Sequence, residues 1–196
     1  CLNQFITKTT VAGASLGGLI CLKLCLEAPE LVKKAVLLNP AGIRDFSLSA
    51  ANLYYNILPI ISPKRKNIET FLDRAILHAP EHTIPQQFKE LIIDYQLHVL
   101  KRFNDKSDKP AKAIPQNELN QIKTPVYLIL GDKDLLFPCK DVVRIAQKEI
   151  KSMQKITVLP NVAHGIETSN EAMSLLANII TNAETNIQAS LQAASV

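Results

Sequence analysis

The sequence predicts an α/β fold in which a mostly parallel sheet of about four strands is flanked by helices, with an all-helical insertion in the middle. Short apolar runs typical of buried strands alternate with helix-length segments near both ends of the chain. Between residues 43 and about 123, apolar residues recur at helical spacing and prolines interrupt the pattern. Strands that alternate with helices are joined by right-handed crossovers, which makes the sheet parallel.

The expected elements follow from these patterns. Four apolar or β-branched runs are expected to be strands: 7–12, 35–38, 126–130 and 155–159. Six segments are expected to be helices: 19–28, 51–61, 68–78, 86–103, 140–150 and one from about 170 to 180. The chain then divides into a first core part at 1–42, the helical insertion at 43–123, a second core part at 124–181 and a polar tail at 182–196.

Length and composition favour one globular core. The chain has 196 residues, 47% of them hydrophobic, and a formal net charge of +4. The small charge is spread along the chain, which argues against a nucleic-acid partner. No run approaches the ~20 apolar residues that a membrane span requires. The four cysteines form no CxxC pair and are interpreted as free thiols, so a reducing, cytoplasmic location is expected. No His or Cys cluster has metal-ligand spacing, and no metal or other cofactor is expected.

The segment GASLGG places a serine between a predicted strand and a predicted helix. Gly13, Ser15 and Gly17 form the pattern Gly-x-Ser-x-Gly, which has meaning in this strand–turn–helix context. The turn is so tight that both glycines are expected where a β-carbon would clash with neighbouring backbone. The Ser15 hydroxyl would point into a cleft, and the backbone N–H of Leu16 would stabilise a developing oxyanion. The alternative is an ordinary glycine-rich turn whose serine caps the helix.

A serine hydroxyl needs a base to become a good nucleophile, and in this context the acid and then the histidine follow the serine. Asp134 and His164 each follow an apolar strand, at the end where open α/β sheets place their sites. We interpret Asp134 as the acid that orients the imidazole and His164 as the base. Asp132, nearer the strand end, is the competing acid. The remaining histidines lie in the insertion and are expected to be surface or structural residues: His78, His82 and His98.

Several blocks together resemble the α/β-hydrolase superfamily. They are GASLGG at 13–18, APELV at 28–32 with LLNPA at 37–41, LGDKD at 130–134 with Pro138, and LPNVAH at 159–164. The similarity is greatest to single-domain esterase and C–C-bond-hydrolase-like members, and it covers nearly the whole chain apart from the tail. It implies Ser15 as nucleophile, Asp134 as acid, His164 as base and the Leu16 amide as one oxyanion donor. It also implies that the insertion is the lid that members carry after the sixth strand.

The chain departs from the family pattern at its start. Members have about four strands before the serine turn, and a loop among them supplies the second oxyanion donor. Only about ten residues precede Gly13 here, of which Cys1 to Ile6 resemble the end of a helix. The chain thus resembles the C-terminal half to two-thirds of a member, with strands five to eight. The first strand would be an exposed edge, open to pairing with the missing half or another chain, and the fragment alone is expected to be inactive.

The resemblance implies hydrolysis of a small or medium ester, or a related acyl bond, through an acyl-enzyme. Two alternatives use the same fold: a C–C-bond hydrolase or acyltransferase with the same triad, and a non-catalytic binding protein. Apolar residues of the lid are candidates for a substrate pocket or for its own packing: Leu53, Tyr54, Ile57, Phe71 and Leu72.

Overall fold

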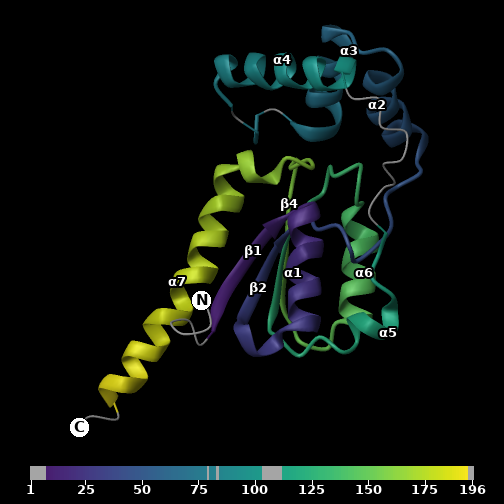
Figure 1. The fold of residues 1–196 in the computed structure, drawn as a ribbon. Coiled ribbons are helices and arrows are strands. Elements are labelled where there is room, and N and C mark those ends of the chain that lie inside the picture. The colour runs from purple at the N-terminus through teal and green to yellow at the C-terminus, as the bar shows by residue number, and fades with distance from the viewer. Residues whose placement is uncertain (1–7, 79, 83, 103–111, 194–196) are drawn as a thin grey trace.

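The computed structural model describes residues 8–78, 80–82, 84–102 and 112–193, and only the backbone of 182–193. The expectation for residues 1–6 therefore lies outside the described residues. Within these ranges, four strands form one parallel sheet in the order β1-β2-β3-β4 (Figure 1). Their bounds are Thr9–Ala14 for β1, Val32–Leu38 for β2, Val126–Gly131 for β3 and Met153–Leu159 for β4. The predicted parallel sheet of four strands is confirmed, although β1 begins two residues later than expected.

Helices cover both faces of this sheet. Those of α-helical type in the described ranges are α1 (Leu16–Glu27), α2 (Ala50–Ile61), α3 (Arg65–Phe71), α4 (Gln86–Arg102), α5 (Gln116–Leu119), α6 (Cys139–Glu149) and α7 (Asn170–Ala193). Short turns of other helical types are η2 (Pro29–Leu31), η3 (Leu72–Ile76) and η4 (Ile166–Thr168). Helices α1 and α6 lie on one side of the sheet and α7 on the other (Figure 1). Within the described residues, no helix combines the length and hydropathy that crossing a bilayer requires.

Strand β2 explains why the core has two halves. Its side chains alternate, so that Ala35 and Leu37 pack under α1 and α6 while Val36 and Leu38 pack under α7. All four are at most 3% exposed. Both faces of the strand are therefore buried, which is why its sequence is a continuous apolar run rather than an alternating one.

Helix α7 is longer than the sequence pattern suggested, and it continues without a break past residue 181 to Ala193. Its first half packs on the sheet through Ala172, Leu176 and neighbouring apolar residues. Lys34 on β2 reinforces this contact, because its ammonium donates to the backbone carbonyls of Ile179 and Ile180.

The insertion at 43–123 holds helices α2, α3, α4 and α5, and apart from an isolated bridge no strand is found in its described part. We call α2, α3, η3 and α4, with the turn up to His82, the helical layer. The expected helix at 68–78 is instead the end of α3 followed by the π-helical turn η3. Four buried residues form the centre of these helices: Ile68, Leu72, Leu77 and Ile93. The last part of the insertion behaves differently, because Ile114, Leu119 and Ile122 pack into the main core. Residues 114–122 of the predicted insertion therefore belong to the main core, and the helical layer ends before them.

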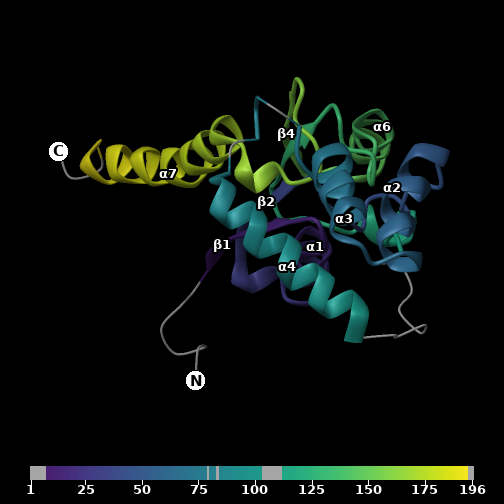
Figure 2. The same cartoon turned by 90° about the horizontal axis from the view of Figure 1, so that it is seen from above.

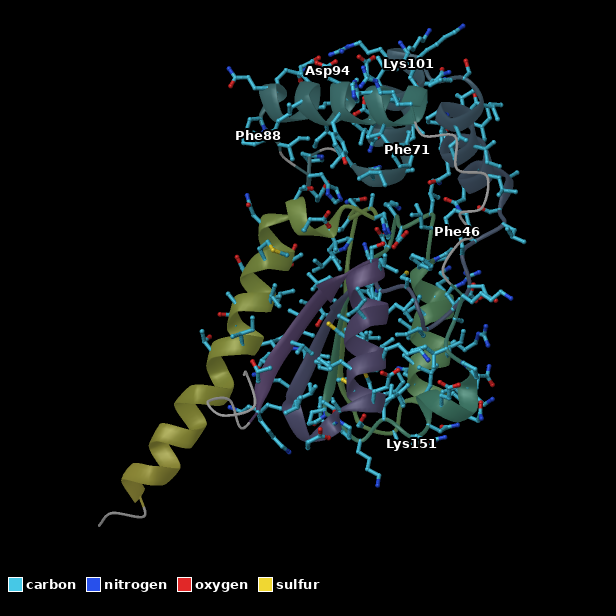
Figure 3. The ribbon with its side chains drawn as sticks, in the orientation of Figure 1. Phe46, Phe71, Phe88, Asp94, Lys101 and Lys151 are labelled. Carbon is cyan, nitrogen blue, oxygen red and sulfur yellow. The ribbon has the colours of Figure 1, made fainter. Side chains whose placement is uncertain are left out.

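The helical layer lies over the carboxyl ends of the strands. Seen from above, α4 crosses over β1, β2 and α1 (Figure 2). Asp94 and Lys101 lie on the side of α4 that faces away from the sheet, and Phe71 lies beneath the helix (Figure 3). Phe71 packs in the cluster at the centre of these helices, which lie over the end of the sheet where open α/β folds hold their ligands.

Candidate active site

Ser15 lies in the turn between β1 and α1 with an unusual backbone conformation. Its φ of 51° and ψ of −119° fall in a region that non-glycine residues rarely occupy. Three backbone hydrogen bonds hold it there: its N–H donates to Leu38 O at 3.0 Å, and its carbonyl accepts from Gly18 N and from Ala41 N, both at 2.9 Å. The side chain does not cap α1. The capping alternative is therefore wrong, and the hydroxyl is free to face elsewhere.

The glycines around Ser15 differ in what they contribute. A β-carbon at Gly13 would lie 2.3 Å from the Gly17 carbonyl oxygen, so the turn requires glycine there, as expected. The same expectation is wrong for Gly17, whose β-carbon would have nothing within 4 Å. Gly18 is the second tight position, because a β-carbon there would lie 2.4 Å from Cβ of Pro40. The close approach of α1 to the loop after β2 therefore depends on Gly18.

The structure brings together the three residues that the sequence predicted, from three separate loops. The Ser15 Oγ lies 2.8 Å from Nε2 of His164, and Nδ1 of His164 lies 2.9 Å from Oδ2 of Asp134. A carboxylate can only accept, so Nδ1 carries the proton and Nε2 is left to accept from the serine hydroxyl. This arrangement allows proton transfer from Ser15 to His164.

Asp134 rather than Asp132 faces the histidine. The Asp134 side chain is fully buried, and its Oδ1 accepts from the N–H groups of Leu136 at 2.8 Å and Phe137 at 3.0 Å. These bonds offset the cost of burying a carboxylate. Asp132 is exposed and its charged partner is Lys133. The ring of Phe137 also packs against the imidazole of His164, with 5.7 Å between centroids, and fixes its plane.

Asn39, at the end of β2, ties the parts of the site together. It is 1% exposed and has a positive φ of 39°. Its Oδ1 accepts from Gly131 N at 2.8 Å, and its Nδ2 donates to the carbonyls of Ala163 at 2.8 Å and His164 at 3.2 Å. One side chain therefore links the end of β2 to the end of β3 and to the histidine loop. Sequence reasoning treated this residue only as part of a turn.

Other sequence-predicted residues fall as follows. Leu16 is the first residue of α1, so its N–H has no acceptor within the helix and is available at the serine. His98 is exposed, as expected. His82 is buried and contacts the histidine loop, which the sequence did not indicate.

Cys21, Cys25 and Cys139 are free thiols, as expected, and burial raises the pKa of Cys25 to about 11. Within the described residues, no group of three His, Cys, Asp or Glu side chains could hold a metal ion.

An open pocket of about 250 Å³ lies between residues of α2, α3 and α4. Its lining is largely apolar: Asn56, Pro59, Ile60, Phe71, Tyr95, Gln96, Val99 and Leu100. None of the three site residues contributes to it. The five apolar residues predicted to line a pocket or pack the lid differ in their surroundings. Phe71 lines this pocket, Leu72 is buried, Leu53 is half-buried, and Tyr54 and Ile57 are exposed.

Comparison with known proteins identifies the fold. No family model matches the sequence. An uncharacterized carboxylesterase of Bacillus subtilis (strain 168), nap, is 26% identical over 167 residues, which cover 83% of this chain and 52% of that protein. The solved structure of carboxylesterase CesB (YbfK) from Bacillus subtilis matches with a TM-score of 0.67 at 19% identity, covering 91% of this chain and 60% of that one.

A second solved structure, 2-hydroxy-6-oxo-6-phenylhexa-2,4-dienoate hydrolase (BphD) from Rhodococcus sp. strain RHA1, matches with a TM-score of 0.71 at 19% identity. It covers 90% of this chain and 65% of that one. The chain therefore has the α/β-hydrolase fold. It spans about half the length of the curated relative and 60–65% of the length of these two structures.

The two neighbouring glycines of α1 provide a matched test of the serine turn. We expect Gly17→Ala to leave the 196-residue chain as stable or to stabilise it by ~0.5–1 kcal/mol, because helical alanine loses less backbone entropy than glycine. Gly18→Ala should destabilise it by about 1–3 kcal/mol, because the new methyl group overlaps Pro40. Urea unfolding of both variants checks this, and equal effects would show that the spacing between α1 and Pro40 is not tight.

The bonds of Asn39 can be tested by Asn39→Asp, which keeps the acceptor and removes the amide donor. We expect a loss of about 1–3 kcal/mol at neutral pH, since a carboxylate would face two carbonyl oxygens. Protonation restores one donor, so the loss should shrink as the pH falls. Asn178→Asp is the control, because Asn178 is exposed on α7 and its side chain has no hydrogen bond to the described residues, and it should change stability by less than ~0.5 kcal/mol. A pH-independent loss for Asn39→Asp would contradict the donor role.

Proposed function

We propose that the full-length protein is a serine hydrolase that cleaves a small or medium ester, or a related acyl bond, through an acyl-enzyme. The observation that carries the proposal is the continuous series of contacts from Asp134 through His164 to Ser15, at 2.9 Å and 2.8 Å. Ser15 is partly exposed whereas Asp134 is buried, so the hydroxyl is the accessible end of the series. Similarity to carboxylesterases and other hydrolases of this fold supports the assignment.

In the first half of the reaction, Oγ of Ser15 attacks the carbonyl carbon and Nε2 of His164 takes the hydroxyl proton. Asp134 holds the ring in the required tautomer and stabilises the imidazolium. The carbonyl oxygen becomes an oxyanion, to which the Leu16 N–H donates at the positive end of α1. When the bond to the leaving alcohol breaks, His164 gives that alcohol the proton and the acyl group remains on Ser15.

In the second half, a water molecule attacks the acyl carbon and His164 takes a proton from it. The tetrahedral intermediate collapses, the acid is released and the proton returns to Oγ of Ser15. Strain in the Ser15 backbone helps here, because it keeps Oγ toward His164 and the Leu16 N–H toward the same side of the turn. No metal or organic cofactor is needed for these steps.

The rest of the full-length protein is proposed to complete the sheet beside β1. This strand is an edge of the sheet, and none of its six residues is fully buried. On the neighbouring helix, Leu16 and Ile20 are 55% and 61% exposed. An unpaired strand and an uncovered apolar face normally have a partner. Because the second oxyanion donor is expected from the same region, the 196 residues alone should have little activity.

A C–C-bond hydrolase is the second candidate, favoured by the likeness to BphD. A substrate trial on the full-length protein separates the two reactions. We expect turnover of p-nitrophenyl acetate and butyrate, measured by release of nitrophenolate, at rates well above those for a 2-hydroxy-6-oxo-dienoic acid, measured by loss of its absorbance. The reverse order of rates would replace the ester assignment by C–C cleavage with the same residues.

Fluorophosphonate labelling tests the assignment of the three residues. Peptide mapping should locate the label on Ser15 of the full-length protein, and His164→Ala should slow labelling by roughly 10³-fold or more, because the hydroxyl loses its base. Asp134→Asn should slow it by a similar factor, whereas Asp132→Asn, two residues away and exposed, should leave it unchanged.

Absence of any label on the folded full-length protein would contradict the hydrolase proposal and favour a non-catalytic binding protein. If Asp134→Asn and Asp132→Asn changed the labelling rate equally, the assignment of Asp134 as the acid would be contradicted, while the roles of Ser15 and His164 would stand.

A further inference from the structure

The loop that carries His164 is hydrogen-bonded to the helical layer on both sides of the histidine. The N–H of Ala163 donates to Nε2 of His82 at 2.7 Å. The N–H of Gly165 donates to the carbonyl oxygen of Ile76, also at 2.7 Å. The two residues that flank the proposed base are thus hydrogen-bonded to His82 and Ile76, which lie more than 80 positions earlier in the chain.

Further contacts make this attachment close and specific. A β-carbon at Gly165 would lie 2.9 Å from the Ile76 carbonyl oxygen, so the approach of the two backbones requires glycine. His82 pairs with Ser169 in an antiparallel bridge just beyond the loop. The carbonyl of Ala163 is meanwhile held by Asn39 from the core side. The Ala163 residue is therefore held by the sheet through its carbonyl and by the helical layer through its N–H.

The hydrogen bonds of His82 require one protonation state. An amide N–H can only donate, so Nε2 must accept from Ala163 and cannot carry a proton. Nδ1 lies 2.8 Å from Oγ1 of Thr168, whose own hydroxyl proton is donated to the Gly165 carbonyl at 2.8 Å. Thr168 must accept from Nδ1, which therefore carries the proton. His82 fits this site only as a neutral ring with hydrogen on Nδ1.

The surroundings of His82 bear on its charge. The residue is 6% exposed, and this burial lowers its pKa below the ordinary value for histidine. His78 on the same segment acts in the same direction, whereas the Gly165 backbone and the carboxylates of Glu167 and Glu81 raise the pKa and offset part of the shift. Because the net pKa is lowered, the folded state keeps the neutral ring through the ordinary histidine range, and protonation breaks the contact only at pH values below that range.

We propose that His82 is a positioning residue, which holds the His164 loop through the Ala163 N–H and releases it when protonated. A proton on Nε2 would point at the Ala163 N–H, and two donors cannot share that position. One of them must move, and Ala163 is covalently next to the proposed base. The inference rests on the proposed function, because it concerns the reactivity of Ser15, but it concerns a residue that no step of the reaction uses.

The tautomer can be measured without any reaction. In the full-length protein labelled with [15N]histidine, two-bond 1H–15N correlation should show His82 protonated on Nδ1 and unprotonated on Nε2 near neutral pH. His82→Asn assigns the signal. A proton on Nε2 would overturn the proposal, because that tautomer cannot accept from Ala163.

Two variants separate positioning from bulk packing. In His82→Gln the side-chain oxygen reaches the place of Nε2 and does not titrate, whereas the shorter side chain of His82→Asn reaches only the place of Nδ1. The rate of fluorophosphonate labelling of Ser15 is to be measured between about pH 4 and about pH 8, a range that extends below the ordinary histidine pKa because the pKa of His82 is lowered. His82→Asn should label roughly 10- to 100-fold more slowly at neutral pH, since the base is displaced. His82→Gln should label within about threefold of the wild type and lose rate less steeply on acidification, because one of two ionisations is gone.

His98→Gln is the matched control on α4, and its labelling should be unchanged. The proposal is overturned if the Gln and Asn variants both label like the wild type with the same pH dependence. If the wild type itself takes no label, the hydrolase proposal fails, and the tautomer measurement alone then decides whether His82 holds the loop.

Discussion

The end of strand β2 is the constraint on which the candidate site depends. Its last carbonyl, on Leu38, fixes the backbone of Ser15, and its next side chain, on Asn39, fixes the start of the acid loop and the histidine loop. Both contacts are possible because β2 is paired in parallel with β1 and with β3, so that the three strands end at one edge. The buried apolar strand β2 therefore positions Ser15 and the loops that carry Asp134 and His164, although none of these residues belongs to it.

The proposed triad was recoverable from sequence because its signals are local. Ser15, Asp134 and His164 each closely follow an apolar strand, and parallel strands bring such positions together. The role of Asn39 was not recoverable, because its partners at Ala163 and His164 lie more than 120 residues away and depend on register. His82 stands in a proline-rich turn with no periodic pattern around it. The prediction for Gly17 fails for a different reason. The motif predicts a glycine with no space for a β-carbon, but the structure has no atom within 4 Å of that position.

The fold itself followed from the alternation of strands and helices, but the limits of its layers did not. Residues 114–122 continue the proline-interrupted apolar pattern of the segments before them, and only tertiary packing shows that Ile114, Leu119 and Ile122 belong to the main core. In the same way, η3 replaces the end of a predicted helix where the chain turns to meet the histidine loop through Ile76. This π-helical turn lies where the helical layer contacts the candidate site, a position where π-helical turns are often found.

The backbone angle of Ser15 has a consequence for how the sequence can change. A non-glycine residue in this conformation costs on the order of 1–3 kcal/mol, which the contacts to Leu38 and Ala41 offset. Replacement of Ser15 by glycine would relieve that cost but would remove the hydroxyl that faces His164. Selection for thermal stability alone would therefore favour glycine at this position and abolish the proposed chemistry. An ancestral or consensus reconstruction guided by stability scores should hold the serine fixed.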